Sequence, residues 1–137
     1  MNLPIKFSDE ILNARDRGLP IVALESTIIT HGMPYPQNLK TAIEVEEIVR
    51  RHKAVPATIA IINGEISIGM SKPQLTQLAR ATDARKLSRA DLPLCLSSKK
   101  TGSTTVAATM ICAKLADINV FATGGIGGVH KNVSETM

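Results

Sequence analysis

The chain has 137 residues, 44% of them apolar and 20% charged, with a formal net charge of +4. This composition can build a buried core, so it excludes a disordered tail, and the length fits one domain. Aromatic residues make up only 2% and no Lys/Arg run exceeds two residues, so we expect no nucleic-acid partner. A signal-peptide pattern and a membrane-length apolar run are both lacking, so we expect no membrane partner. Cys95 and Cys112 lie far apart among apolar residues, so we expect reduced thiols in a cytoplasmic protein.

Helix and strand patterns alternate along the chain. In chain order they predict a helix over 8–17, a strand over 21–24, a helix over 37–52, strands over 57–62 and 65–69, a helix over 71–81, a short strand over 85–88, a helix over 103–115 and a strand over 118–123. Asn63-Gly64 predicts a hairpin turn. We therefore predict an α/β fold with a mostly parallel sheet packed between helices and one β-hairpin. Because a covering helix is expected after the last strand, the fold should be C-terminally incomplete.

Candidate site residues follow the predicted strands, and ligands bind beyond the carboxyl ends of strands in open α/β sheets. Glu25 comes directly after the strand 21–24 and could be a general acid, or a salt-bridged or capping carboxylate. The stretch 101–105, Thr-Gly-Ser-Thr-Thr, precedes a predicted helix. Its free backbone N–H groups could bind phosphate, or Ser103 or Thr104 could be a simple N-cap.

Two further signals are weaker. The glycine-rich stretch 124–128 either lets the backbone approach a ligand or forms a tight turn, and it is not a dinucleotide fingerprint. Lys86 is either an ordinary surface lysine or a phosphate- or hydroxyl-binding one. The histidines have no metal-like spacing; they are His31, His52 and His130. The residues alone therefore predict no metal site and name no reaction.

Seven stretches together resemble the pseudouridine-5'-phosphate glycosidase family, in the family's order over about residues 19–137. They are 22–34, 36–38, 55–60, 86–89, 91–93, 104–107 and 121–130. The resemblance implies that residues 1–137 form the N-terminal part of a single domain of this family. It also implies a homotrimer.

The reaction implied by the resemblance is the reversible cleavage of pseudouridine 5'-phosphate, with water, to uracil and ribose 5-phosphate, a step of pseudouridine catabolism. The bond that breaks joins two carbons, so the uracil carbon must be protonated as it leaves. The family uses a lysine that opens the ribose ring and forms a Schiff base, a glutamate that donates the proton, and manganese.

Carried over residue by residue, Glu25 is the catalytic proton donor and Lys86 binds substrate. Val106 contacts substrate through its backbone at a helix start, and Thr105 and His130 line the same pocket. The family's metal-binding aspartate and imine-forming lysine match positions after residue 137, so we expect these residues alone to be inactive. Two alternatives stay open, a non-catalytic phosphosugar-binding module and a defective truncated product.

Overall fold

The computed structural model describes residues 2–126, so His130 lies outside the described residues. Five α-helices are present in this part of the chain: α1 (Asp9–Asp16), α2 (Gln37–Arg51), α3 (Lys72–Arg80), α4 (Leu92–Ser97) and α5 (Val106–Leu115). A π-helical turn η1 (Ile28–Gly32) and a 3-10 turn η2 (Arg89–Asp91) accompany them. The strands are β1 (Ile5–Phe7), β2 (Ile21–Leu24), β3 (Val55–Ile62), β4 (Glu65–Ile68), β5 (Arg85–Leu87), β6 (Gly102–Thr104) and β7 (Val120–Ala122).

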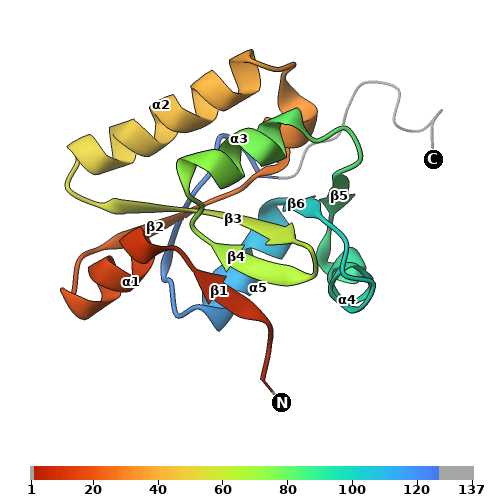
Figure 1. The fold of residues 1–137 in the computed structure, drawn as a ribbon. Coiled ribbons are helices and arrows are strands. Elements are labelled where there is room, and N and C mark those ends of the chain that lie inside the picture. The colour runs from red at the N-terminus through yellow and green to blue at the C-terminus, as the bar shows by residue number, and fades with distance from the viewer. Residues whose placement is uncertain (1, 127–137) are drawn as a thin grey trace.

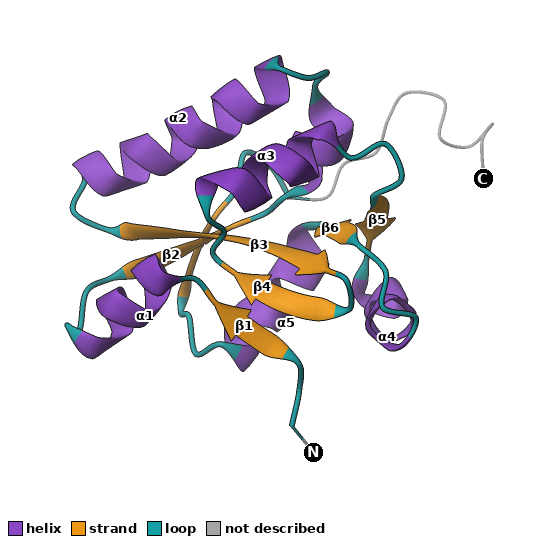
Figure 2. Ribbon diagram, viewed as in Figure 1, coloured by secondary structure: helices purple, strands orange, loops and turns teal. Residues whose placement is uncertain are grey.

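The strands form one mixed sheet with helices on both faces (Figures 1 and 2). Its main path runs β1-β4-β3-β2-β7, while β6 pairs with β3 and with β5. Four pairings are parallel, β1 with β4, β2 with β3, β2 with β7 and β5 with β6. The β3–β4 hairpin and the β3–β6 pair are antiparallel. The predicted α/β fold, mostly parallel and with one hairpin, is confirmed.

Strand β3 is apolar along its whole length because both of its faces are covered. Ile59 and Ile61 belong to a core cluster shared with α1, α4 and α5, whereas Ala60 belongs to a second cluster shared with α2, α3 and η1. The two clusters are the two faces of the sheet. This explains why residues 57–62 show no alternation of apolar and polar side chains.

Local signals set the predicted boundaries. The Ser8 hydroxyl accepts a hydrogen bond from the Ile11 N–H at the start of α1, and Ser71 forms a capping box with Gln74 at the start of α3. Asn63 and Gly64 have φ of +51° and +79°, the left-handed pair that a tight hairpin turn requires. None of the helices in the described residues has the length and apolar character that crossing a membrane needs.

One predicted boundary is wrong. The helix expected from residue 103 begins at Val106, and Gly102–Thr104 forms strand β6 instead. The residue at the N-cap position is Thr105, so Ser103 and Thr104 do not cap α5. The strand forms because it pairs with β3 on one side and with β5 on the other, which local sequence does not reveal. The short elements β1 and α4 were also absent from the sequence prediction.

Candidate functional site at the carboxyl ends of four strands

The carboxyl ends of β2 and β6 meet beside the middle of β3. Leu24 of β2 pairs with Thr58, and Ser103 of β6 pairs with Ala60, so the two strands approach each other along β3 from opposite directions. Since β7 is parallel to β2 and β5 is parallel to β6, their carboxyl ends point to the same place. We call this meeting point of β2, β5, β6 and β7 the strand-end site.

A buried network of hydroxyl groups fastens the two strand ends together. The Thr104 N–H donates to Ser26 Oγ (2.8 Å), and the Ser26 N–H donates to the Thr104 carbonyl (3.3 Å). Thr27 Oγ1 donates to the same carbonyl (2.9 Å), and Thr104 Oγ1 donates to the Ile59 carbonyl (2.7 Å). Thr109 Oγ1 of α5 lies 2.8 Å from Thr104 Oγ1. Because Ser26, Thr104 and Thr109 are fully buried, the network holds the residues on either side of it in fixed positions.

Glu25 is the first residue after β2 and is half-buried. Thr123, the first residue after the parallel strand β7, donates its hydroxyl to Glu25 Oε1 at 3.1 Å. The carboxyl group borders a cavity of about 200 Å³ between β2, β7 and α2. Its lining is mostly apolar and includes Leu24, Ile28, Ile29, Ala42, Val45 and Ala122. A carboxyl group fixed beside a small apolar cavity is suited to transferring a proton to a bound molecule.

Lys86, Thr105 and Val106 lie on the other side of the hydroxyl network. Lys86 is exposed on β5 and pairs in register with Ser103 of β6. Thr105 Oγ1 donates to the Leu87 carbonyl (2.7 Å), so it does not cap α5. The first N–H groups of α5, starting at Val106, therefore receive no side-chain cap within the described residues. Lys86 and the uncapped N-terminus of α5 thus flank strand β6 near its carboxyl end, and each is a group that can bind a phosphate.

The π-helical turn η1 adds residues to this site that sequence reasoning did not select. Thr30 Oγ1 donates to Ser103 Oγ at 2.6 Å and lies 2.5 Å from Nδ1 of the exposed His31. Thr123 was missed as well. Its signal was available, because a polar residue that ends a strand parallel to 21–24 should lie beside Glu25.

The structure thus places Glu25, Lys86, Thr105 and Val106 around one set of strand ends, with His130 outside the described residues. The predicted roles of these residues stay predictions. In the part of the chain that the structure describes, no three His, Cys, Asp or Glu side chains are grouped so that they could hold a metal ion. The described residues by themselves therefore do not fit a manganese site, and no step below is derived through a metal.

The fold is that of an α/β protein with a candidate ligand site at converging strand ends. The model of the family described as "Indigoidine synthase A like protein" matches residues 10–137, so the chain belongs to this family.

Curated relatives confirm the resemblance seen in the sequence motifs. The chain is 62% identical over 137 residues to a pseudouridine-5'-phosphate glycosidase of Jannaschia sp. (strain CCS1), covering 100% of this chain and 45% of the relative. It is 57% identical over 137 residues to the protein of the same name from Geobacillus kaustophilus (strain HTA426), covering 46% of that relative. The chain therefore spans less than half the length of these relatives.

Two solved structures share the fold. The prealnumycin C-glycosynthase AlnA, in complex with ribulose 5-phosphate, is 38% identical with a TM-score of 0.83, over 99% of this chain and 44% of AlnA. An indigoidine synthase A-like protein from Thermotoga maritima MSB8 is 31% identical with a TM-score of 0.80, over 93% of this chain and 41% of that one. The matched part of both proteins is the α/β unit described above.

Proposed function

We propose that the protein carrying this chain cleaves the carbon–carbon bond of pseudouridine 5'-phosphate, releasing uracil and ribose 5-phosphate. The observation that carries the proposal is the position of Glu25. It is held by Thr123 at the carboxyl end of β2 and borders an apolar cavity, while Lys86 and the start of α5 lie across the hydroxyl network. The names of the curated relatives supply the reaction.

In this proposal the two sides of the strand-end site have different tasks. Lys86 and the Val106 N–H bind the phosphate, because the lysine charge and the helix dipole both favour a dianion. Glu25 donates its proton to the uracil carbon, which keeps the electron pair of the breaking carbon–carbon bond, so uracil leaves neutral. The ribose carbon takes up the oxygen of a water molecule and a proton of that water returns to Glu25, which gives ribose 5-phosphate. The ribulose 5-phosphate bound to AlnA supports a phosphosugar ligand for this fold.

Other parts of the proposal come from the family resemblance. They are a lysine that forms a Schiff base with the ribose, a manganese ion, a homotrimer, and Thr105 and His130 as residues lining the substrate pocket. A cytoplasmic location is supported by Cys95 and Cys112, which are both buried and both unpaired with any other described cysteine.

The test is uracil release from pseudouridine 5'-phosphate with manganese present. Two proteins are compared, the 137-residue chain and a fusion that adds the segment following the matched region in the Jannaschia relative. We expect no release above a no-protein control from the chain alone and enzymatic release from the fusion. Glu25→Gln in the fusion should lower kcat at least about a hundredfold, the contribution typical of a general acid. A folded fusion that releases no uracil would overturn the proposal.

A second candidate is a non-catalytic phosphosugar-binding module, favoured by Lys86 on β5 and the uncapped start of α5, which both flank strand β6. Saturating ribose 5-phosphate should then raise the Tm of the 137-residue chain, since a ligand that binds only the folded state stabilises it. Lys86→Gln should abolish the shift. A chain that shows no cooperative melt would instead support a defective product.

A further inference from the structure

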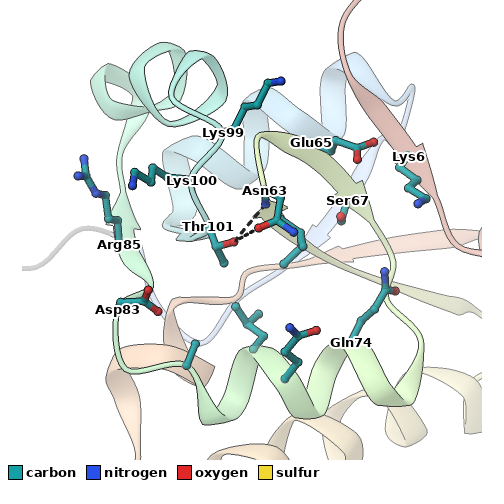
Figure 3. A pocket seen from close by; sticks show the side chains of 14 residues that line it. Lys6, Asn63, Glu65, Ser67, Gln74, Asp83, Arg85, Lys99, Lys100 and Thr101 are labelled. Atoms are coloured by element: carbon teal, nitrogen blue, oxygen red, sulfur yellow. Dashed lines mark hydrogen bonds between the residues drawn. The ribbon is translucent and has the colours of Figure 1, made fainter.

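A second pocket lies at the opposite end of β6 from the strand-end site (Figure 3). It has a volume of about 630 Å³ and is enclosed by α3, the β3–β4 hairpin and the turn that leads into β6. We call it the hairpin cleft. Strand β6 connects the two places, because Thr101 lines the cleft and Thr105 lies at the strand-end site. Nothing in the proposed reaction uses the hairpin cleft.

Positive charge predominates around the hairpin cleft. Four basic side chains and two acidic ones line it, a net charge of +2; they are Lys6, Arg85, Lys99, Lys100, Glu65 and Asp83. None of them is among the ion pairs found within the described residues, all of which involve Arg50. Figure 3 shows Lys99 and Lys100 on one side of the cleft and Lys6 on the other. These cations are therefore available to an anionic ligand.

The wall that carries the two lysines is held rigidly. The Gly64 N–H donates to the Lys100 carbonyl (2.9 Å), and the Asn63 N–H donates to Thr101 Oγ1 (3.1 Å). Lys99 itself has φ of +54°, a conformation that is uncommon for a residue with a side chain. A Cβ atom on Gly64 would lie only 2.7 Å from Lys99 Cα, so the hairpin and the lysine turn are in close contact. A wall fixed in advance loses little conformational freedom when a ligand binds.

We propose that the hairpin cleft binds a small phosphorylated metabolite. The phosphate would interact with Lys99, Lys100 and Arg85, while the amides of Asn63 and Gln74 would bond to hydroxyl groups of the ligand. A phosphate-rich ligand without a base fits best, because among the described residues no aromatic side chain lines the cleft to stack on a nucleobase. The proposal is independent of the reaction at the strand-end site.

Lysine labelling of the whole 137-residue chain tests directly where the anionic ligand binds. Acetylation of each lysine by an N-hydroxysuccinimide ester is followed by mass spectrometry, with inorganic pyrophosphate as the probe. Pyrophosphate should slow the modification of Lys99 and Lys100, and leave the exposed Lys40 and Lys114 unchanged. Equal rates with and without the probe, or equal protection of all lysines, would overturn the proposal. Protection of Lys86 alone would place the probe at the strand-end site and overturn it too.

Calorimetric titration with pyrophosphate compares the affinity of the parent chain with the affinities of two double variants. The double variant Lys99→Gln/Lys100→Gln should bind at least about tenfold more weakly than the parent chain, as expected when two charge-assisted contacts are lost. The control Lys40→Gln/Lys114→Gln removes the same net charge from α2 and α5, away from the cleft, and should keep the parent affinity. If both double variants weaken binding equally, the attraction is due to overall charge and the cleft is not a site.

Discussion

At the scale of single residues, Thr123 is the partner that fixes Glu25. Its hydroxyl donates to Glu25 Oε1 at 3.1 Å, and the two residues end neighbouring parallel strands. We predict that Thr123→Val in the fusion protein lowers kcat for uracil release about tenfold and leaves KM unchanged. The reason is that the valine keeps the shape but lets the proton donor move away from the reacting carbon. Steady-state kinetics with pseudouridine 5'-phosphate provide the measurement.

Thr76→Val is the matched control, because the Thr76 hydroxyl donates only to the Lys72 carbonyl of its own helix. It should leave both kinetic constants unchanged. A proportional rise in KM with unchanged kcat for Thr123→Val would instead assign that threonine to substrate binding.

Glu46 is a buried carboxyl group of α2 that the proposed reaction does not use. Burial raises its pKa above the ordinary value of 4.5, against the opposing effects of the Thr58 hydroxyl, which donates to Oε2 at 2.6 Å, and of Arg50. The folded state therefore binds this proton more tightly than the unfolded chain, so Glu46 costs stability progressively as the pH rises from about 4.5 through its raised pKa.

We accordingly predict that Glu46→Gln gains stability relative to the parent chain when the pH rises from about 4 to about 7. Urea unfolding of both proteins at the two pH values measures the difference. Glu47→Gln is the control, since it removes another carboxylate bonded to Arg50 from an exposed position. A relative stability of Glu46→Gln that stays constant or falls with pH would contradict the prediction.

At the scale of elements, Gly102 permits the close pairing of β5 with β6. A Cβ atom there would lie 2.6 Å from Leu87 Cδ1 and 2.9 Å from the Arg85 carbonyl. We predict that Gly102→Ala lowers the free energy of unfolding by about 1–3 kcal/mol, the usual cost of overpacking. Urea unfolding should show a lower midpoint. Gly124→Ala is the control, because a Cβ atom at Gly124 meets nothing within 4 Å, and its midpoint should not change.

The elements that the sequence predicted are those with a local cause. The buried run of β3, the Asn63-Gly64 turn and the caps Ser8 and Ser71 all lie within the segments they define. Strand β6 was missed because its stability comes from elsewhere, since Thr104 bonds to Ser26, 78 positions away. The strand β1 was missed for the same reason, because its three residues pair with β4 about sixty positions later in the chain.

The residues of the strand-end site also divide into those recognisable from local sequence and those that depend on distant segments. Glu25 could be selected from the sequence because it directly follows an obvious strand, and Lys86 and Val106 because they match family motifs. The hydroxyl network could not, since it depends on how β2 and β6 are arranged, and Thr123 could be chosen only by assuming that its strand is parallel to β2 and beside it. The hairpin cleft could not be predicted from the sequence either, because its walls come from segments as far apart in the chain as Lys6 and Thr101.

At the scale of the whole molecule, the reactivity of the two thiols tests whether these 137 residues adopt this fold. Cys95 lies on α4 and Cys112 on α5, and both belong to the same core cluster. Burial raises the pKa of Cys112 to about 11 and also raises that of Cys95. Only the thiolate reacts with alkylating reagents, so a folded core should protect both side chains.

We predict that iodoacetamide near neutral pH alkylates Cys112 of the folded chain at least about a hundredfold more slowly than in urea. Raising the pKa of this thiol from 9.0 to about 11 lowers the thiolate fraction by about that factor, and burial slows access of the reagent further. Mass spectrometry of the alkylated peptides measures both rates, and Cys95→Ser isolates Cys112. Modification at the unfolded rate would contradict the fold described for α4 and α5 and support a defective product. Slow modification of both thiols would show that one core forms from these residues, since α4 and α5 must then pack against the sheet together.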